Sequence, residues 1–149
     1  LLQNRKKLKG SYFEDKEIIS SFVQKLPWAE KNYRAYLPFF PYAIEGLDVS
    51  SYDLILSSSH CAATGVLSHS DQLHICYCHT PARYAWDLMR EYLRGKRVWN
   101  KIAQVFLHSF RSWDVQSSNR VDEFIANSRY VAQRIKKIYR REAHVIYPP

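Results

Sequence analysis

Glycine is scarce in this sequence, and the motifs that depend on glycine are missing. Only four glycines occur among 149 residues, and none belongs to a GxGxxG or GxxxxGKS phosphate-binding loop. The GxSxG turn that presents a nucleophilic serine is missing too, because residues 57–59 are three serines with no glycine beside them. The sequence therefore indicates neither a glycine-rich nucleotide loop nor a serine hydrolase.

Long hydrophobic runs are also missing. No apolar stretch approaches the roughly 20 residues that a membrane-spanning helix needs, and residues 1–9 lack the hydrophobic core of a signal peptide. The three cysteines, Cys61, Cys76 and Cys78, are an odd number, and two of them fall in a predicted buried strand. This pattern favours reduced thiols and a cytoplasmic protein.

Acidic residues are outnumbered by basic ones. The chain has 14 Asp and Glu against 22 Lys and Arg, a net charge of +8, and much of the excess lies in residues 5–9 and 136–141. A basic surface attracts any polyanion, and a solvated cationic face explains the same charges equally well. Because no RNP-type motif is evident, we expect no nucleic acid partner. Peripheral contact with the anionic inner face of a membrane is compatible with the charge.

Short apolar runs predict the strands of a sheet. They are too short for helices, and their continuous apolar character is typical of parallel strands covered on both faces. These runs span residues 53–56, 74–78, 122–126 and 144–147.

Helical periodicity fills the intervals between these runs. It predicts helices over residues 15–26, 84–93, 98–119 and 130–139, and a helix or irregular turn over 33–47. The predicted buried stripe of the longest helix is Ile102, Phe106, Phe110, Trp113 and Ser117. Strands that alternate with helices predict an α/β fold, a Rossmann-like parallel sheet flanked by helices.

Polar residues follow three of the predicted strands at the point where each strand ends. They are residues 57–60 (SSSH), His79 with Thr80, and Asn127 with Ser128. In open parallel sheets, ligands bind outside the carboxyl ends of the strands. The sequence therefore predicts a binding site at this edge.

The cysteines and histidines do not have the spacing of a metal site. Cys76 and Cys78 alternate with Tyr77 along a strand, so both point to one face and form a core pair, whereas structural zinc sites favour CxxC turns. The predicted places of His69, His74 and His144 are the surface or the start of a strand. We expect no metal site.

Three segments have both a functional and a purely structural interpretation. His79 ends a buried strand before Pro81, so it can contact a sugar or a phosphate, or be hydrogen-bonded in a turn. Residues 83–87 contain Arg83, Tyr84, Trp86 and Asp87, which suit a phosphate and a sugar face but equally the packing of a first helical turn. Ser128 can open an anion-binding helix N-terminus or act only as an N-cap.

Three segments resemble the N-terminal domain of family 4 glycosyltransferases, in particular their mannosyltransferases of polysaccharide assembly. The segments are residues 33–60 (YRAYLPFFPYAIEGLDVSSYDLILSSSH), 73–87 (LHICYCHTPARYAWD) and 113–149 (WDVQSSNRVDEFIANSRYVAQRIKKIYRREAHVIYPP). The resemblance implies a GT-B enzyme with two Rossmann-like domains across a cleft. It implies sugar transfer with retention of configuration, without a metal or cofactor, from a nucleotide-sugar such as GDP-mannose to a glycan or lipid-linked acceptor.

The same resemblance assigns roles to individual residues. It implies that His79 lies beside the donor sugar as the catalytic residue, and that Asn127 and Ser128 form the phosphate-facing turn of the cleft. It places acceptor contacts in two further stretches, before and after the predicted second strand. Their residues are Ser59, His60, Thr80, Arg83, Tyr84, Trp86 and Asp87.

The chain also departs from the family pattern. The early glycine-rich loop and the C-terminal donor-binding domain are not in residues 1–149. We therefore expect a single, truncated N-terminal GT-B domain that is inactive alone. The alternative is a stand-alone flavodoxin-like module that uses its basic surface to bind anionic lipid or nucleic acid.

Overall fold

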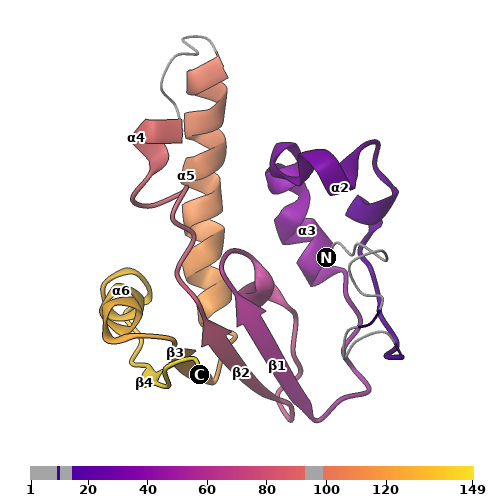
Figure 1. Ribbon diagram of the computed structural model, residues 1–149, viewed down its shortest axis with the longest axis vertical. Coiled ribbons are helices and arrows are strands. Elements are labelled where there is room, and N and C mark those ends of the chain that lie inside the picture. The colour runs from indigo at the N-terminus through magenta and orange to yellow at the C-terminus, as the bar shows by residue number, and fades with distance from the viewer. Residues whose placement is uncertain (1–9, 11–14, 93–98) are drawn as a thin grey trace. The chain divides into compact units, whose positions relative to one another are not determined.

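The computed structural model describes residues 10, 15–92 and 99–149 (Figure 1). Within them the chain forms two compact units, residues 1–47 and 48–149. The residues that carry the predicted site all lie in the second unit.

The first unit is built from short helices. They are the 3-10 helix η1 (Phe22–Lys25), α2 (Ala29–Asn32), the 3-10 helix η2 (Tyr33–Phe39) and α3 (Phe40–Glu45). Pro38 lies inside η2, and Gly46 caps the end of α3. The helix or irregular turn expected over residues 33–47 is thus confirmed as a 3-10 helix followed by an α-helix.

The helix predicted over residues 15–26 is wrong. Only η1 is helical there, and Ser21 is extended, with φ −72° and ψ 169°. The stretch before it contains the β-branched Ile18 and Ile19 and the serines Ser20 and Ser21. β-Branched residues lose side-chain freedom in a helix, and serine side chains compete for backbone hydrogen bonds. The helical spacing of the apolar residues was therefore not enough to form a helix here.

The second unit contains the predicted parallel sheet. Its strands β1 (Leu54–Ser59), β2 (Leu73–Cys78), β3 (Glu123–Ala126) and β4 (His144–Val145) are parallel and lie in the order β1-β2-β3-β4. Connections between them include the 3-10 helix η3 (Ala63–Gly65), α4 (Met89–Tyr92), α5 (Trp99–Ser118) and α6 (Arg129–Tyr139). The α/β, Rossmann-like fold class is confirmed.

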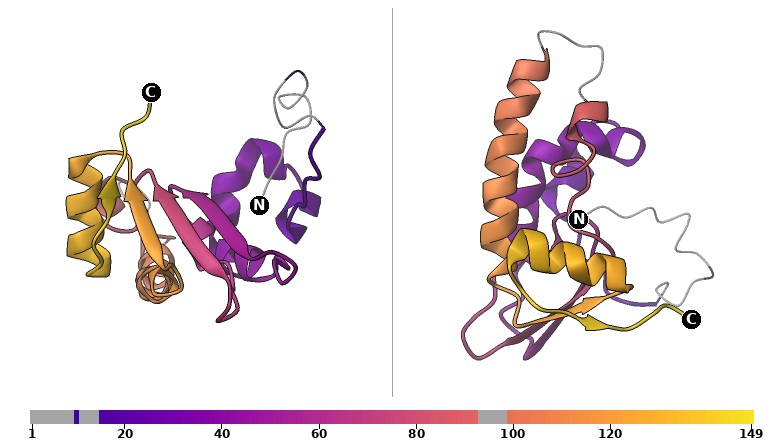
Figure 2. Two further views of the ribbon diagram at one scale, coloured as in Figure 1. Left: turned by 90° about the horizontal axis from the view of Figure 1, so that it is seen from below. Right: turned by 90° about the vertical axis from the view of Figure 1, so that its left-hand side faces the viewer.

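One face of the sheet forms the core of this unit. Helices α5 and α6 lie over that face, as the two views of Figure 2 show. Cys76, Cys78 and Phe124 of the sheet pack with Val131 and Ile135 of α6. Cys76 and Cys78 share this buried face, as their spacing predicted, and all three cysteines of the chain are free.

The opposite face of the sheet does not match the prediction that both faces are covered. Leu54 and Leu56 of β1 are 55% and 69% exposed, and Leu73 of β2 is 46% exposed. Buried residues alternate with exposed or half-buried ones along most of both strands, so one face is buried more deeply than the other. The prediction of two covered faces was wrong because the exposed positions of these strands are apolar as well.

The long helix α5 begins and ends close to its predicted limits, although Val98 lies outside the described residues. Its buried side differs from the predicted stripe, since Ile102 is 62% exposed and the charged Asp114 is fully buried. The side that faces the core carries Leu107, Phe110, Asp114 and Ser117. None of the described helices is long and apolar enough to cross a membrane.

Candidate functional site

The carboxyl ends of three strands lie side by side. Ser59 of β1 is paired with Cys78 of β2, and Cys78 is paired with Ala126 of β3. Because each of these residues ends its strand, the next residues along the chain, among them His79 and Asn127, begin at one edge. The structure therefore brings the predicted strand-end residues together.

The first strand continues through residues that were predicted to follow it. Ser57, Ser58 and Ser59 belong to β1, because the facing residues of β2 continue as a strand through Cys78. Ser59 is therefore buried on the helix-covered face, whereas His60 is exposed beyond the strand. The prediction that the serines follow the first strand is wrong, because they belong to it.

His79 is exposed and held at the sheet edge. Its Nε2 atom lies 2.9 Å from Oγ of Ser58, and its ring packs edge-on against Tyr77 with 5.2 Å between centroids. Its backbone N–H donates to the carbonyl of Ser59 at 2.7 Å. Ser58, one of the polar residues expected at the end of the first strand, thus fixes the orientation of the imidazole. The neighbouring Thr80 donates its hydroxyl to the Pro81 carbonyl at 3.1 Å.

Residues 83–87 form turns rather than the predicted helix over 84–93. Helix α4 begins only at Met89, and Leu93 lies outside the described residues. Side chains of this loop bind other elements: the Tyr84 hydroxyl lies 2.6 Å from Sγ of Cys61, and Asp87 forms an ion pair with Arg134 of α6. These tertiary bonds explain why the loop does not follow its helical periodicity.

Asp114 links the loop to both long helices. Its carboxylate accepts hydrogen bonds from Nε1 of Trp86 at 2.8 Å and from the Tyr139 hydroxyl at 3.0 Å, although it is fully buried on α5. Burial raises the pKa of Asp114 to about 6, against the opposing effect of the two hydrogen bonds. Since Trp86 donates a hydrogen bond to this buried carboxylate, the orientation of its indole ring is fixed.

Ser128 is a helix N-cap. It is extended, and its hydroxyl accepts from the backbone N–H of Val131 at 3.3 Å while donating to Oδ1 of Asn127 at 3.1 Å. The predicted N-cap at Ser128 is therefore confirmed. The half-buried Asn127 lies at the strand edge directly before it.

His74 lies at the start of β2, which is one of the two places predicted for it. Its side chain is fully buried, and its Nε2 lies 2.9 Å from Oγ of Ser57. Burial lowers the pKa of His74, and its Nδ1 lies 3.3 Å from the Arg120 carbonyl. A neutral ring that donates from Nδ1 and accepts at Nε2 satisfies both contacts, so His74 is a structural residue.

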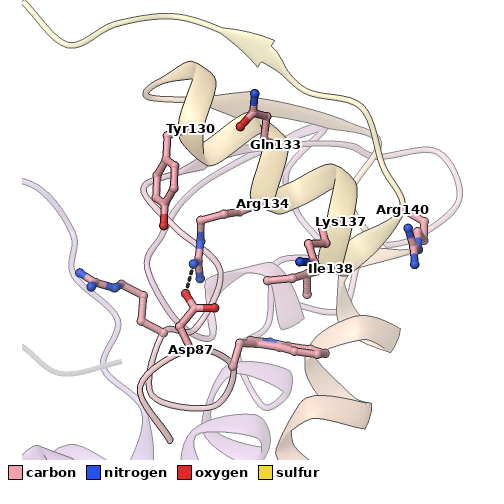
Figure 3. Close-up of a pocket in the computed structure, with 9 residues that line it drawn as sticks. Asp87, Tyr130, Gln133, Arg134, Lys137, Ile138 and Arg140 are labelled. Carbon is pink, nitrogen blue, oxygen red and sulfur yellow. Dashed lines mark ion pairs between the residues drawn. The ribbon is translucent and has the colours of Figure 1, made fainter. Parts of the chain in front are cut away.

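A pocket of about 670 Å³ lies between the loop and α6 (Figure 3). We call it the α6 pocket. It is lined by Arg83, Trp86, Asp87, Tyr130, Gln133, Arg134, Lys137, Ile138 and Arg140. Figure 3 shows Asp87 and Arg134 facing each other, with Tyr130, Gln133 and Lys137 on the helix above the loop.

The sequence predicted site residues only on the loop side of the α6 pocket. The helical periodicity of residues 130–139 puts Val131, Ile135 and Ile138 on an apolar stripe, with the arginines and lysines on the opposite side. A single helix face carries positions i, i+3, i+4 and i+7, and these positions are Tyr130, Gln133, Arg134 and Lys137. That spacing was a usable signal, but it does not reveal that a loop faces it.

Comparison with known proteins identifies the family. The family model described as glycosyltransferase family 4 matches residues 7–149, which is nearly the whole chain. The chain belongs to glycosyltransferase family 4. No curated protein and no solved structure matches it.

Membership of this glycosyltransferase family gives the site a chemical context. It indicates transfer of a glycosyl group, which requires a sugar donor and an acceptor. It does not favour the alternative of a stand-alone binding module. Among the described residues, no group of three His, Cys, Asp or Glu side chains is placed to hold a metal ion.

Proposed function

We propose that this chain forms the acceptor side of a retaining, metal-independent glycosyltransferase of the GT-B type, as its N-terminal domain. The observation that carries the proposal is an exposed His79 at the aligned carboxyl ends of three strands in a family 4 chain. Ligands of open parallel sheets bind at such ends. A donor-binding domain, which residues 1–149 do not include, completes the active site in this proposal.

The proposed reaction moves mannose from GDP-mannose to a glycan or a lipid-linked acceptor. The resemblance to the mannosyltransferases of polysaccharide assembly supports this choice of donor and acceptor. Transfer takes place in the cytoplasm, and the basic excess of the chain supports a peripheral contact with the anionic inner face of a membrane.

His79 is the proposed catalytic residue. The hydrogen bond between Ser58 and Nε2 fixes the ring, and the exposed imidazole can contact a hydroxyl of the donor sugar. Arg83, Tyr84, Trp86 and Asp87 are proposed to contact the acceptor. Asn127 and Ser128 are proposed to face the donor phosphates from the start of α6.

Transfer by the complete gene product tests this proposal. We expect mannose transfer from GDP-mannose in the presence of EDTA, with the anomeric configuration retained in the product by NMR. His79→Ala should lower the rate at least about a hundredfold, the order of effect that positioned acid–base and electrostatic groups have. His144→Ala is the matched control, because it removes a second exposed histidine, one that pairs with Glu123.

Three results would contradict the proposal. They are a product of inverted configuration, complete loss of transfer in EDTA, and an unchanged rate in the His79→Ala variant. A further expectation concerns residues 1–149 alone, which should transfer no sugar. Sugar transfer by that chain would overturn the assignment of the donor site to another domain.

A further inference from the structure

The α6 pocket carries an excess of positive charge. Four of its residues are cationic and only Asp87 is a carboxylate, so three positive charges remain uncompensated. Asp87 is itself engaged by Arg134. Among the residues that the structure describes, Arg83, Lys137 and Arg140 form no ion pair.

Two cations that adjoin residues of the pocket in the sequence have protein partners. Lys136 pairs with Glu142 at 2.8 Å. Arg141 donates to the carbonyls of Ser118 and Asp122 at 3.3 and 2.8 Å. These two cations are satisfied by the protein, whereas Arg83, Lys137 and Arg140 line the cavity without an ion pair among the described residues.

Arg134 supplies an independent sign of an anion site. The residue is only 9% exposed, and its Nε–H has no hydrogen-bond partner among the described residues. Burial lowers its pKa, and the nearby guanidinium of Arg83 lowers it further. A buried donor without a partner is unfavourable, and a bound oxyanion would supply an acceptor for the guanidinium and offset the repulsion between the two arginines.

The other walls of the pocket suit a sugar ring next to that anion. Tyr130 is 68% exposed, and the Arg134 guanidinium lies 5.8 Å from the centre of its ring. The ring of Trp86 is fixed by its bond to Asp114. Gln133 adds an amide that can both donate to and accept from hydroxyl groups. Ile138 is the one aliphatic residue in the lining, so the pocket does not suit an acyl chain.

We propose that the α6 pocket binds a phosphorylated saccharide, with the phosphate on Arg83, Arg134 and Lys137 and the sugar against Trp86 and Tyr130. Its volume of about 670 Å³ is within the usual range for small-molecule sites. The identification of this ligand as the acceptor rests on the proposed function, whereas its binding can be measured without any transfer reaction.

Titration calorimetry on the 149-residue chain at constant ionic strength tests the proposal. Glucose 6-phosphate should bind, inorganic phosphate should bind more weakly, and glucose should not bind measurably. Lys137→Gln and Arg83→Gln should each weaken glucose 6-phosphate binding about tenfold, because each removes a charge-assisted contact from a different wall. Circular dichroism confirms that both variants are folded.

Lys136→Gln is the matched control, because it removes one charge from the neighbouring position of the same helix. It should change the affinity less than about twofold, as expected for an exposed pair. The proposal would be overturned if glucose and glucose 6-phosphate bound with equal affinity. It would also be overturned if Lys136→Gln and Lys137→Gln lowered the affinity for glucose 6-phosphate equally.

A second arm separates the sources of the phosphorylated sugar. Phosphatidylcholine vesicles that carry a polyprenyl-diphosphate-linked hexose are compared with plain phosphatidylcholine vesicles. If the chain binds only the vesicles that carry the hexose, and this binding needs Lys137, the proposal is supported and the ligand is lipid-linked. If the chain binds only the soluble sugar phosphate, and this binding needs Lys137, the proposal is supported and the ligand is a soluble sugar phosphate. If the pocket binds either ligand while the complete gene product transfers no sugar, the pocket assignment holds and the proposed function fails.

Discussion

The buried carboxylate of Asp114 should make the stability of this protein depend on pH in an unusual direction. In the folded state its pKa is raised from 3.8 to about 6 by burial. The folded state therefore holds a proton that the unfolded chain releases at lower pH. The stability that this proton confers is complete below about pH 4 and is lost as the pH rises through about pH 6.

The size of the effect follows from the same shift. A difference of roughly two pKa units, at about 1.4 kcal/mol each, corresponds to about 3 kcal/mol of unfolding free energy. Asp114→Asn removes the ionisation but keeps the shape. An asparagine can still accept from Nε1 of Trp86 and can donate its amide hydrogen to the Tyr139 hydroxyl oxygen.

Urea unfolding, followed by tryptophan fluorescence from pH 4 to pH 8, measures this effect. The wild type should lose about 3 kcal/mol of unfolding free energy as the pH rises from 4 to 8, and Asp114→Asn should not show this loss. The unfolding free energy of the variant minus that of the wild type should therefore increase by about 3 kcal/mol over this range. Asp71→Asn removes the same charge from an exposed position and is the control for net charge. The reasoning would be refuted if the difference in unfolding free energy between Asp114→Asn and the wild type did not change with pH. It would also be refuted if the wild type became more stable relative to the variant as the pH rises.

Two further predictions concern the edge of the sheet and its core. Ser128→Ala should lower the unfolding free energy by about 1 kcal/mol in the same urea assay, because the N–H of Val131 loses its cap; Ser128→Asp, which keeps an acceptor, should restore it. Burial raises the pKa of the Cys61 thiol to about 12 and that of Cys76 to about 11. Both should react with a thiol reagent at pH 8 only after unfolding, and rapid labelling in the folded state would contradict this burial.

Much of the second unit was predictable because its periodicity is local. The strands were located to within a few residues, and α6 begins and ends within one residue of its predicted bounds. The parallel arrangement followed from the alternation of strands with helices. The cap at Ser128 followed as one of two interpretations, because caps depend on residues that are neighbours in the sequence.

Errors arose where a partner distant in the sequence decided the outcome. Ser57 and Ser59 join β1 because β2 continues beside them. The loop at residues 83–87 is not helical, since Trp86 and Asp87 bind side chains of α5 and α6. No local pattern contains those partners.

For the site, the sequence by itself determined which chemistry gathers at the carboxyl edge of the sheet: a histidine, an asparagine and a loop rich in aromatic and charged residues. Only the tertiary structure decided that Ser58 orients His79 and that Asp114 is buried. It also decided that one face of α6 closes a cationic pocket over the loop. The physical reason is that periodicity specifies which face of an element is apolar, whereas the neighbour of its polar face is set by how the whole chain packs.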